Sequence, residues 1–282
     1  MGFHTDLAVE LHESLAKKTD GIEVNKTSHD GIKTTEITVK TESAAAALGK
    51  PVGKYITIET DSIMRRDGHE EECIFAVKNA LYGLVGNVES ALVCGIGNRE
   101  ITADRVGPDS ASMILSTRHI SPHFAKSFGL GRLSSVSAIS PGVLGQTGIE
   151  VSEYLKGIAK NINPQIIIAI DALSAREISR LGVTVQLSNS GITPGSGVHN
   201  ARNEISEKTI GIPVISIGVP TVIDCRTLVE DCKGSMDSDL NMIVTPREID
   251  TMVEHASNIV AMGINLFLQP HISLEDMMML VG

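Results

Sequence analysis

An unbroken apolar run in the middle of the chain, Ile166–Ile170, most constrains what this sequence can fold into. Four of its five residues are isoleucine, and such β-branched runs are typical of strands buried on both faces, as in parallel sheets. Asp171 follows directly, and Ser174 precedes Glu177 by three residues, which is capping-box spacing for a helix start. Because ligands of open α/β sheets bind beyond the carboxyl ends of the strands, Asp171 is a candidate for chemistry. The alternative is that Asp171 caps the following turn.

Strands and helices alternate on both sides of this run. Strands are predicted at 91–94, 135–139, 183–187 and 214–218, and helices at 70–84, 108–116, 147–160, 221–230 and 245–260. The alternation predicts an α/β core over 86–282, with a mixed, mostly parallel central sheet flanked by helices. Ahead of the core, residues 7–85 are a β-rich portion in which an Asp-Gly turn predicts a hairpin over 21–39, followed by a strand at 54–60. This portion is either a subdomain or an extension of the same sheet.

Composition argues against several classes of protein. A chain of 282 residues with 42% hydrophobic residues can bury a full core, but its net charge of −10 and its lack of tryptophan argue against a nucleic-acid partner. The four cysteines include no C-x-x-C pair, so they indicate reduced thiols rather than a zinc site. No segment reaches the roughly 18 apolar residues of a membrane span, and the N-terminus has no signal-peptide pattern. We therefore expect a cytoplasmic protein without a membrane partner.

Two glycine-containing segments are candidates for binding. Gly95–Asn98 follows the 91–94 strand and resembles the start of a dinucleotide loop, but Glu100 stands where the third glycine belongs, which favours a tight turn. Asp104 also lies just past a strand end, where spacing alone favours a solvated turn residue over a catalytic one. The loop at 191–197 carries several glycines that let its backbone approach a ligand closely, with a flexible surface loop as the alternative.

Short segments that span most of the chain, in order, carry a further signal. They are Thr5–Glu10, Gly95–Asn98, Asp104–Pro108, Thr117–His119, Pro141–Val143, Thr147–Glu150, Ile168–Leu173, Pro194–Val198, Gly218–Thr221 and Val244–Pro246. Together they resemble the germination protease family of spore-forming bacteria, atypical aspartic endopeptidases that degrade small acid-soluble spore proteins. The resemblance implies a phosphorylase/hydrolase-like α/β fold, a homotetramer in the cytoplasm of the forespore and the spore core, and catalytic aspartates at Asp104 and Asp171.

The resemblance also implies an inactive precursor. The family removes a short N-terminal segment that ends in Thr-Asp before Leu-Ala-Val-Glu, which places the cut here between Asp6 and Leu7. Residues 1–6 are then a propeptide, and 7–282 form a single peptidase domain. The stretch resembles the family's substrates, which have an acidic residue before the cut and an aliphatic one after it. Because the segment lies at a terminus, we expect its opening to cost little free energy.

Two aspartates suffice for a hydrolytic mechanism that uses no metal or cofactor. Carboxylates about 4 Å apart repel by roughly 4 kcal/mol at an effective dielectric constant near 20. That repulsion corresponds to about three pKa units, enough to keep one proton on the pair near neutral pH. The ionised member takes a proton from water, and the protonated one donates to the scissile carbonyl or the leaving amine. Candidates for substrate contact are Gly95, Gly97, Asn98, Pro194, Gly195, Ser196 and Gly197, since the Gly95–Asn98 turn and the loop at 191–197 can supply backbone N–H groups.

The sequence departs from the family pattern beside Asp104 and at His199, and two other functions remain open. Ala103 and Arg105 flank Asp104 where the family more often has Pro and Ala, and His199 replaces a usual Gly. The fold is also similar to that of hydrogenase-maturation endopeptidases, which hold a metal with acidic residues and a His; Asp104, Asp171 and His199 are the matching candidates here. The second alternative is a non-catalytic peptide- or nucleotide-binding module that uses the glycine loops and would tolerate replacement of both aspartates.

Overall fold

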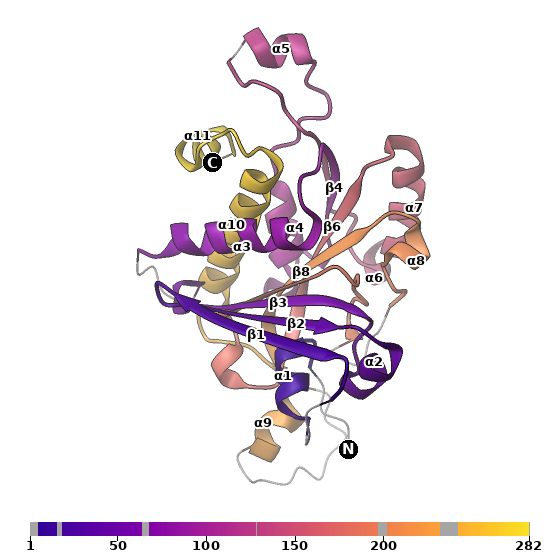
Figure 1. The fold of residues 1–282 in the computed structure, drawn as a ribbon, viewed down its shortest axis with the longest axis vertical. Coiled ribbons are helices and arrows are strands. Elements are labelled where there is room, and N and C mark those ends of the chain that lie inside the picture. The colour runs from indigo at the N-terminus through magenta and orange to yellow at the C-terminus, as the bar shows by residue number, and fades with distance from the viewer. Residues whose placement is uncertain are drawn as a thin grey trace.

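A sheet of nine strands organises the computed structural model, which describes residues 5–15, 19–63, 68–127, 129–196, 202–231 and 242–281 (Figure 1). The strands in these residues are β1 Ile22–His29, β2 Ile32–Val39, β3 Gly53–Glu59, β4 Ser90–Gly95, β5 Ser135–Ile139, β6 Ile166–Ala175, β7 Thr184–Ser188, β8 Val214–Asp224 and β9 Ile243–Val244. Their order across the sheet is β1-β2-β3-β7-β8-β6-β4-β5, and β9 pairs with β8 outside this path.

The sheet has a parallel half and an antiparallel half. Strands β5, β4, β6 and β8 pair in parallel, whereas β7 pairs antiparallel with β8. Strands β3, β2 and β1 then continue the sheet in antiparallel order. The β1–β2 hairpin turns at Asp30 and Gly31, which both have positive φ, as an Asp-Gly turn requires. The N-terminal strands therefore extend the same sheet, and the predicted mixed α/β fold is confirmed.

Helices cover both faces of the sheet (Figure 1). The helices are α1 Ala8–Glu13, α2 Glu42–Leu48, α3 Glu70–Val85, α4 Val106–Ser112, α5 Pro122–Ser127, α6 Leu144–Thr147, α7 Val151–Ile162, α8 Glu207–Ile210, α9 Cys225–Asp231, α10 Ile249–Leu268 and α11 Leu274–Val281. One face packs against α3, α4 and α10 in a single large apolar cluster. The other face carries two separate clusters, one with α7 and α8 over the parallel strands and one with α1 and α2 over the antiparallel strands.

Strand β6 contributes side chains to all three clusters, because successive residues of a strand point to opposite faces. Ile168 packs in the large cluster of the first face. On the second face, Ile167 and Ala169 belong to the α7 cluster, and Leu173 belongs to the α1–α2 cluster. Asp171 lies between them in sequence and on the same face. The strand therefore places a carboxyl group where the two apolar clusters part.

The helix predicted after Ser174 does not form. Ser174 remains in β6, and its backbone C=O and N–H bond to the N–H and the carboxylate of Asp6, each at 2.9 Å. Only a short 3-10 turn, Ile178–Arg180, follows the strand. The capping-box spacing was outweighed because a partner from the far N-terminus satisfies the backbone groups that a helix would otherwise have used.

The other predicted helices form; α3 begins at residue 70 as predicted, and the starts of the rest are shifted. The capping boxes predicted at Thr147 and Thr245 are absent, since α7 and α10 begin after Glu150 and Glu248 without a side-chain cap. Helix α4 begins at residue 106 instead of 108. The helix predicted from Thr221 begins only as α9, because β8 runs on to its pairing with β9. For α4 and α9, the local signal predicted the right element but the wrong starting residue.

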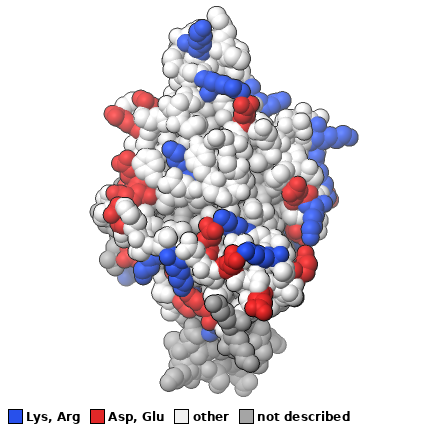
Figure 2. All heavy atoms as spheres, viewed as in Figure 1, with Lys and Arg blue, Asp and Glu red and all other residues white. Residues whose placement is uncertain are grey.

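Charges on the face seen in Figure 2 are mixed. Lysine and arginine side chains lie among aspartates and glutamates there, so the described part of this face carries no broad field of one sign. Across the described ranges, none of the helices combines the length and the apolar character that crossing a bilayer demands.

Two glycines let helix α4 approach the end of β4 at backbone contact. A Cβ atom on Gly95 would lie 2.1 Å from the carbonyl oxygen of Gly107, and one on Gly107 would lie 2.2 Å from the carbonyl oxygen of Ile96. These separations are far below van der Waals contact. The close approach fixes the turn that leaves β4 and carries Asp104.

We predict that Gly95→Ala lowers the free energy of unfolding by about 3 kcal/mol or more, because the added methyl group meets backbone that cannot move aside. Gly157→Ala is the matched control. Gly157 lies in α7 with open space around it, so the same methyl group should raise stability by roughly 0.5–1 kcal/mol. Urea unfolding of both variants measures the difference, and equal effects would contradict the close-packing argument.

Candidate active site

Asp171 is a buried carboxyl group with few partners of its own. It is 4% exposed, and its Oδ1 accepts a hydrogen bond of 3.0 Å from the backbone N–H of Ala172. Burial raises the pKa of Asp171 well above its ordinary value of 3.8, and the negative charges of Asp104 and Asp6 raise it further. The neutral, protonated form of Asp171 is therefore favoured over a wide pH range.

Asp104 reaches the same region from the turn after β4. It ends a 3-10 turn, Thr102–Asp104, and its Oδ2 accepts a 2.7 Å hydrogen bond from the backbone N–H of Asn98. Gly97 makes this turn possible, because its φ is +136° and a Cβ there would lie 2.0 Å from the carbonyl oxygen of Asp104. Burial raises the pKa of Asp104, and the Asn98 hydrogen bond opposes that rise by stabilising the charged form.

Both aspartates line one cavity of about 340 Å³. Its walls come from the β4 turn, the start of α6 and α7, strand β6 and the loop after β7. Asp6 and Glu150 contribute two further carboxyl groups, and Arg202 is a cation on the same cavity. A cavity with two raised-pKa carboxyl groups can hold a proton on one and leave the other free to accept one. This is the chemistry of general acid–base catalysis.

The predicted substrate-contact residues divide among several positions. Gly97, Asn98, Pro194 and Gly195 line the cavity, although the N–H of Asn98 is already bonded to Asp104. Gly95 instead faces Gly107 of α4. Ser196 lines a neighbouring cavity and donates a hydrogen bond to Asp6. Gly197 lies outside the described residues, as does His199.

The predicted cleavage point is buried and well bonded. Asp6 is 8% exposed and Leu7 is fully buried, packed in the α1–α2 cluster. The Leu7 N–H donates to the hydroxyl of Thr5 at 3.1 Å. The expectation that this segment opens at little cost is therefore wrong for Asp6 and Leu7. Their release must break backbone hydrogen bonds and expose apolar surface, because Asp6 bonds to β6 and Leu7 packs in the α1–α2 cluster.

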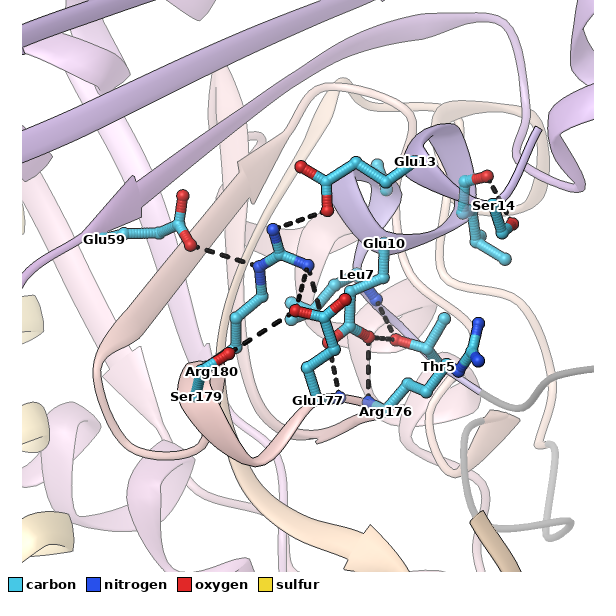
Figure 3. A network of polar contacts seen from close by, with 12 residues as sticks. Thr5, Leu7, Glu10, Glu13, Ser14, Glu59, Arg176, Glu177, Ser179 and Arg180 are labelled. Carbon is cyan, nitrogen blue, oxygen red and sulfur yellow. Dashed lines mark hydrogen bonds and ion pairs between the residues drawn. The ribbon is translucent and has the colours of Figure 1, made fainter. Parts of the chain in front are cut away.

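An ion-pair network fixes the segment that follows this point (Figure 3). The carboxylate of Glu10 accepts hydrogen bonds from the backbone N–H groups of Arg176 and Glu177, at 2.8 and 2.9 Å, and one from the Thr5 hydroxyl. Burial raises the pKa of Glu10, while these hydrogen bonds and the charge of Arg180 oppose the rise. The network thus ties α1 to the end of β6.

Arg180 is the cation of this network. Its guanidinium is 9% exposed and lies among four carboxylates. The contacts are Nε to Glu59 at 3.1 Å, Nη2 to Glu13 at 2.6 Å, and Nη1 to Glu177 at 3.2 Å and to Glu10 at 3.9 Å. Glu10, Glu13 and Glu59 come from the N-terminal third of the chain, and Glu177 directly precedes the 3-10 turn. Arg180 therefore links α1 and β3 to the turn after β6 through ion pairs.

Sequence reasoning missed several residues around the site. The spacing predicts a helix cap at Ser174, whereas the backbone of Ser174 binds Asp6. Gln186 bonds to the backbone on both sides of Leu7, and Arg202 lines the aspartate cavity. No local pattern marks either residue. For Ser174, the one sequence feature that indicated a place near the site was its position three residues after Asp171 on the same apolar strand.

Within the described part of the chain, no three or more His, Cys, Asp or Glu side chains form a group that could hold a metal ion. Asp6, Asp104 and Asp171 share a cavity without being arranged as such a group. The metal alternative would need His199, which is not among the described residues.

The fold is α/β, and two carboxyl groups with raised pKa values line one of its cavities. The sequence model of the family described as Germination protease matches residues 4–237, and the chain belongs to this family of proteases. Relatives of that name are similar over nearly their whole length.

Three of these relatives illustrate the range. The protein from Caldanaerobacter subterraneus subsp. tengcongensis is 36% identical over 316 aligned residues, covering 98% of this chain and 97% of the relative. The one from Clostridium tetani is 37% identical over 318, with 98% of each covered, and the one from Priestia megaterium is 33% identical over 353, with 96% and 95% covered. A solved hydrogenase maturation protease from Thermococcus kodakarensis KOD1 aligns with 66% of this chain and 98% of its own at 16% identity, with a TM-score of 0.38 that supports no argument.

We predict that Arg180→Met lowers the free energy of unfolding by about 3 kcal/mol or more, because it leaves the buried Glu10 without its cation. Arg132→Met is the control. Arg132 pairs with Glu89 at the surface, where both side chains are mostly exposed, so its loss should cost less than about 1 kcal/mol. Chemical denaturation measures both, and a small effect at Arg180 would show that the network does not anchor α1.

We predict that Asp171→Asn stabilises the protein as the pH rises. Below the ordinary pKa of 3.8 the carboxyl group is protonated in both the folded and the unfolded chain, and the substitution should matter little. Above it, ionisation first favours the unfolded chain, because the folded pKa is raised, and each pH unit between the two pKa values costs roughly 1.4 kcal/mol. The amide of the variant does not ionise and carries no such penalty, so the variant's advantage should grow with pH.

The measurement is the unfolding free energy of variant and wild type from about pH 4 to about pH 8. The exposed Asp61→Asn controls for the loss of one negative charge at the surface. A variant advantage that stays constant across this range would contradict a raised pKa at Asp171.

Proposed function

We propose that this chain is an endopeptidase that uses Asp104 and Asp171 to activate water. The observation that carries the proposal is that two carboxyl groups with raised pKa values line one cavity. Asp171 is the more deeply buried and holds the proton. Asp104, whose charged form is supported by the Asn98 N–H, is the ionised partner.

In this mechanism the ionised Asp104 takes a proton from a water molecule as the water oxygen bonds to the scissile carbonyl carbon. Asp171 donates its proton as the C–N bond breaks, so that the leaving amine departs neutral. After release of both products, transfer of one proton from Asp104 to Asp171 restores the starting state. The two groups act together, because the negative charge of Asp104 raises the pKa of Asp171 and so favours the proton on Asp171.

The substrates in this proposal are small acid-soluble spore proteins, cut when spores germinate. The support is membership of the germination protease family, together with the segments that match it on both sides of the cavity. The same relation supports a homotetramer in the cytoplasm of the forespore and the spore core. No cofactor, nucleic acid or membrane enters the proposed reaction.

The proposal includes a precursor that cuts itself between Asp6 and Leu7. Asp6 lines the aspartate cavity, so the bond to be cut begins at a residue that already lies beside the catalytic pair. Its negative charge also raises the pKa of Asp171. Mildly acidic pH is expected to promote the cut, because burial raises the pKa of Glu10 and its protonation would weaken the bonds to the Arg176 and Glu177 N–H groups and to Arg180 that hold the segment.

We predict that Asp104→Asn and Asp171→Asn each lower the cutting of a small acid-soluble spore protein by a factor of about 10² or more, since each removes one half of the acid–base pair. The same variants should retain residues 1–6, whereas the wild type acquires Leu7 as its N-terminus. Mass spectrometry of the substrate and of the enzyme measures both effects. Asp109→Asn is the control, because Asp109 pairs with Arg105 and does not line the cavity.

Wild-type rates in either aspartate variant would contradict the mechanism. Trimming of residues 1–6 at equal speed in wild type and Asp171→Asn would assign that cut to another protease. A further experiment with exhaustive chelation tests the metal alternative. Activity should persist after chelation. A loss of activity that is reversed by adding a transition metal would favour a metal-dependent endopeptidase instead.

A further inference from the structure

Every polar atom of Asp6 has a hydrogen-bond partner in the folded chain. Its backbone N–H donates to the carbonyl oxygen of Ser174 at 2.9 Å, and its own carbonyl oxygen accepts from Nε2 of Gln186 at 3.0 Å. The two carboxylate oxygens accept from the backbone N–H of Ser174 at 2.9 Å and from the hydroxyl of Ser196 at 2.7 Å. We call Ser174, Gln186 and Ser196 the Asp6 seat.

Within the Asp6 seat, different groups contact the backbone and the side chain of Asp6. Gln186 is 8% exposed, and its amide spans the residues around Leu7: Nε2 donates to the carbonyl of Asp6, and Oε1 accepts from the N–H of Ala8 at 2.6 Å. These contacts would hold any amino acid at position 6, because they involve only main-chain atoms. Ser196 and the Ser174 N–H, by contrast, contact the carboxylate itself, and both are donors.

The surroundings of the seat also suit a negative charge. Asp6 and Leu173 lie between the aspartate cavity and a second cavity of about 450 Å³, since both residues line both cavities. Lys50 lines the second cavity, where burial lowers the pKa of its ammonium group and the charge of Asp6 opposes that change. An acidic side chain at this point therefore gains two hydrogen bonds and a nearby cation. A neutral one would leave the donors of Ser174 and Ser196 less well paired.

We propose that the Asp6 seat is the substrate subsite for the residue on the N-terminal side of the cut, with Ser196 selecting a side-chain carboxylate and Gln186 positioning the scissile carbonyl. The subsite rests on the proposed protease function. In the uncut chain, Asp6 occupies the seat. Once the segment that ends at Asp6 has left, the two cavities join and an acidic side chain of a substrate takes its place. Self-cleavage and substrate cleavage then use the same recognition.

The test compares two peptides that copy residues 1–13 of this chain and differ only in having Asp or Asn at position 6. The enzyme is the full chain after release of its own first six residues. Wild-type protein should prefer the Asp peptide in kcat/KM, and Ser196→Ala should reduce this preference by about tenfold, because one hydrogen bond to a charged group is lost. Gln186→Leu should slow the cutting of both peptides and leave the preference unchanged, since Gln186 contacts only the main chain.

Ser190→Ala is the matched control. Ser190 lines the same second cavity, but its hydroxyl bonds to that of Ser188 and not to Asp6. An unchanged Asp preference in Ser196→Ala, or an equal loss in Ser190→Ala, would overturn the subsite while leaving the protease function in place. Failure of the wild type to cut either peptide would instead overturn the protease function and, with it, the subsite.

Discussion

A carboxyl group held in the middle of a buried strand is the constraint on which the rest of this structure depends. Strand β6 supplies isoleucines to the large cluster of one face, and on the other face Asp171 falls between two smaller clusters. A carboxyl group, even when it is protonated, cannot be packed against apolar helices without a desolvation cost. The helices of that face accordingly form two groups that part at Asp171, and the gap between them is the aspartate cavity.

The N-terminal segment closes this gap on one side and is tied to it by its own charges. Asp6 bonds to the strand that carries Asp171, and Glu10 bonds to the turn that follows that strand. Arg180 offsets the acids gathered there. The same residues that stabilise α1 against the sheet also place the Asp6 carboxylate on the cavity that Asp104 and Asp171 line. In the proposed reaction cycle, stability of the precursor and restraint of its activity therefore come from one set of contacts.

The raised pKa values of Asp104 and Asp171 represent a cost in folding free energy near neutral pH. Asp171 is buried and Asp104 is partly buried, each accepts a backbone hydrogen bond, and the charge of Asp104 raises the pKa of Asp171. Such arrangements gather at functional sites, because a proton held near neutral pH is what acid–base chemistry requires. The rigid backbone contact at Gly95 and Gly107 allows the fold to hold Asp104 in this position despite the repulsion.

The sequence by itself determined the α/β class, the buried strand at 166–170, the hairpin and the long helices, because these depend on local periodicity and turn chemistry. It also singled out Asp104 and Asp171, and the family resemblance paired them, but the predicted strand-end positions are wrong, because Asp171 lies inside β6 and Asp104 ends a 3-10 turn. Tertiary structure alone decided that Ser174 stays in a strand, that β8 continues past Gly218, and that Asp6 is buried. Each of these outcomes depends on a hydrogen-bond partner distant in the chain, such as the 168 residues between Asp6 and Ser174, and no local pattern encodes such a partner.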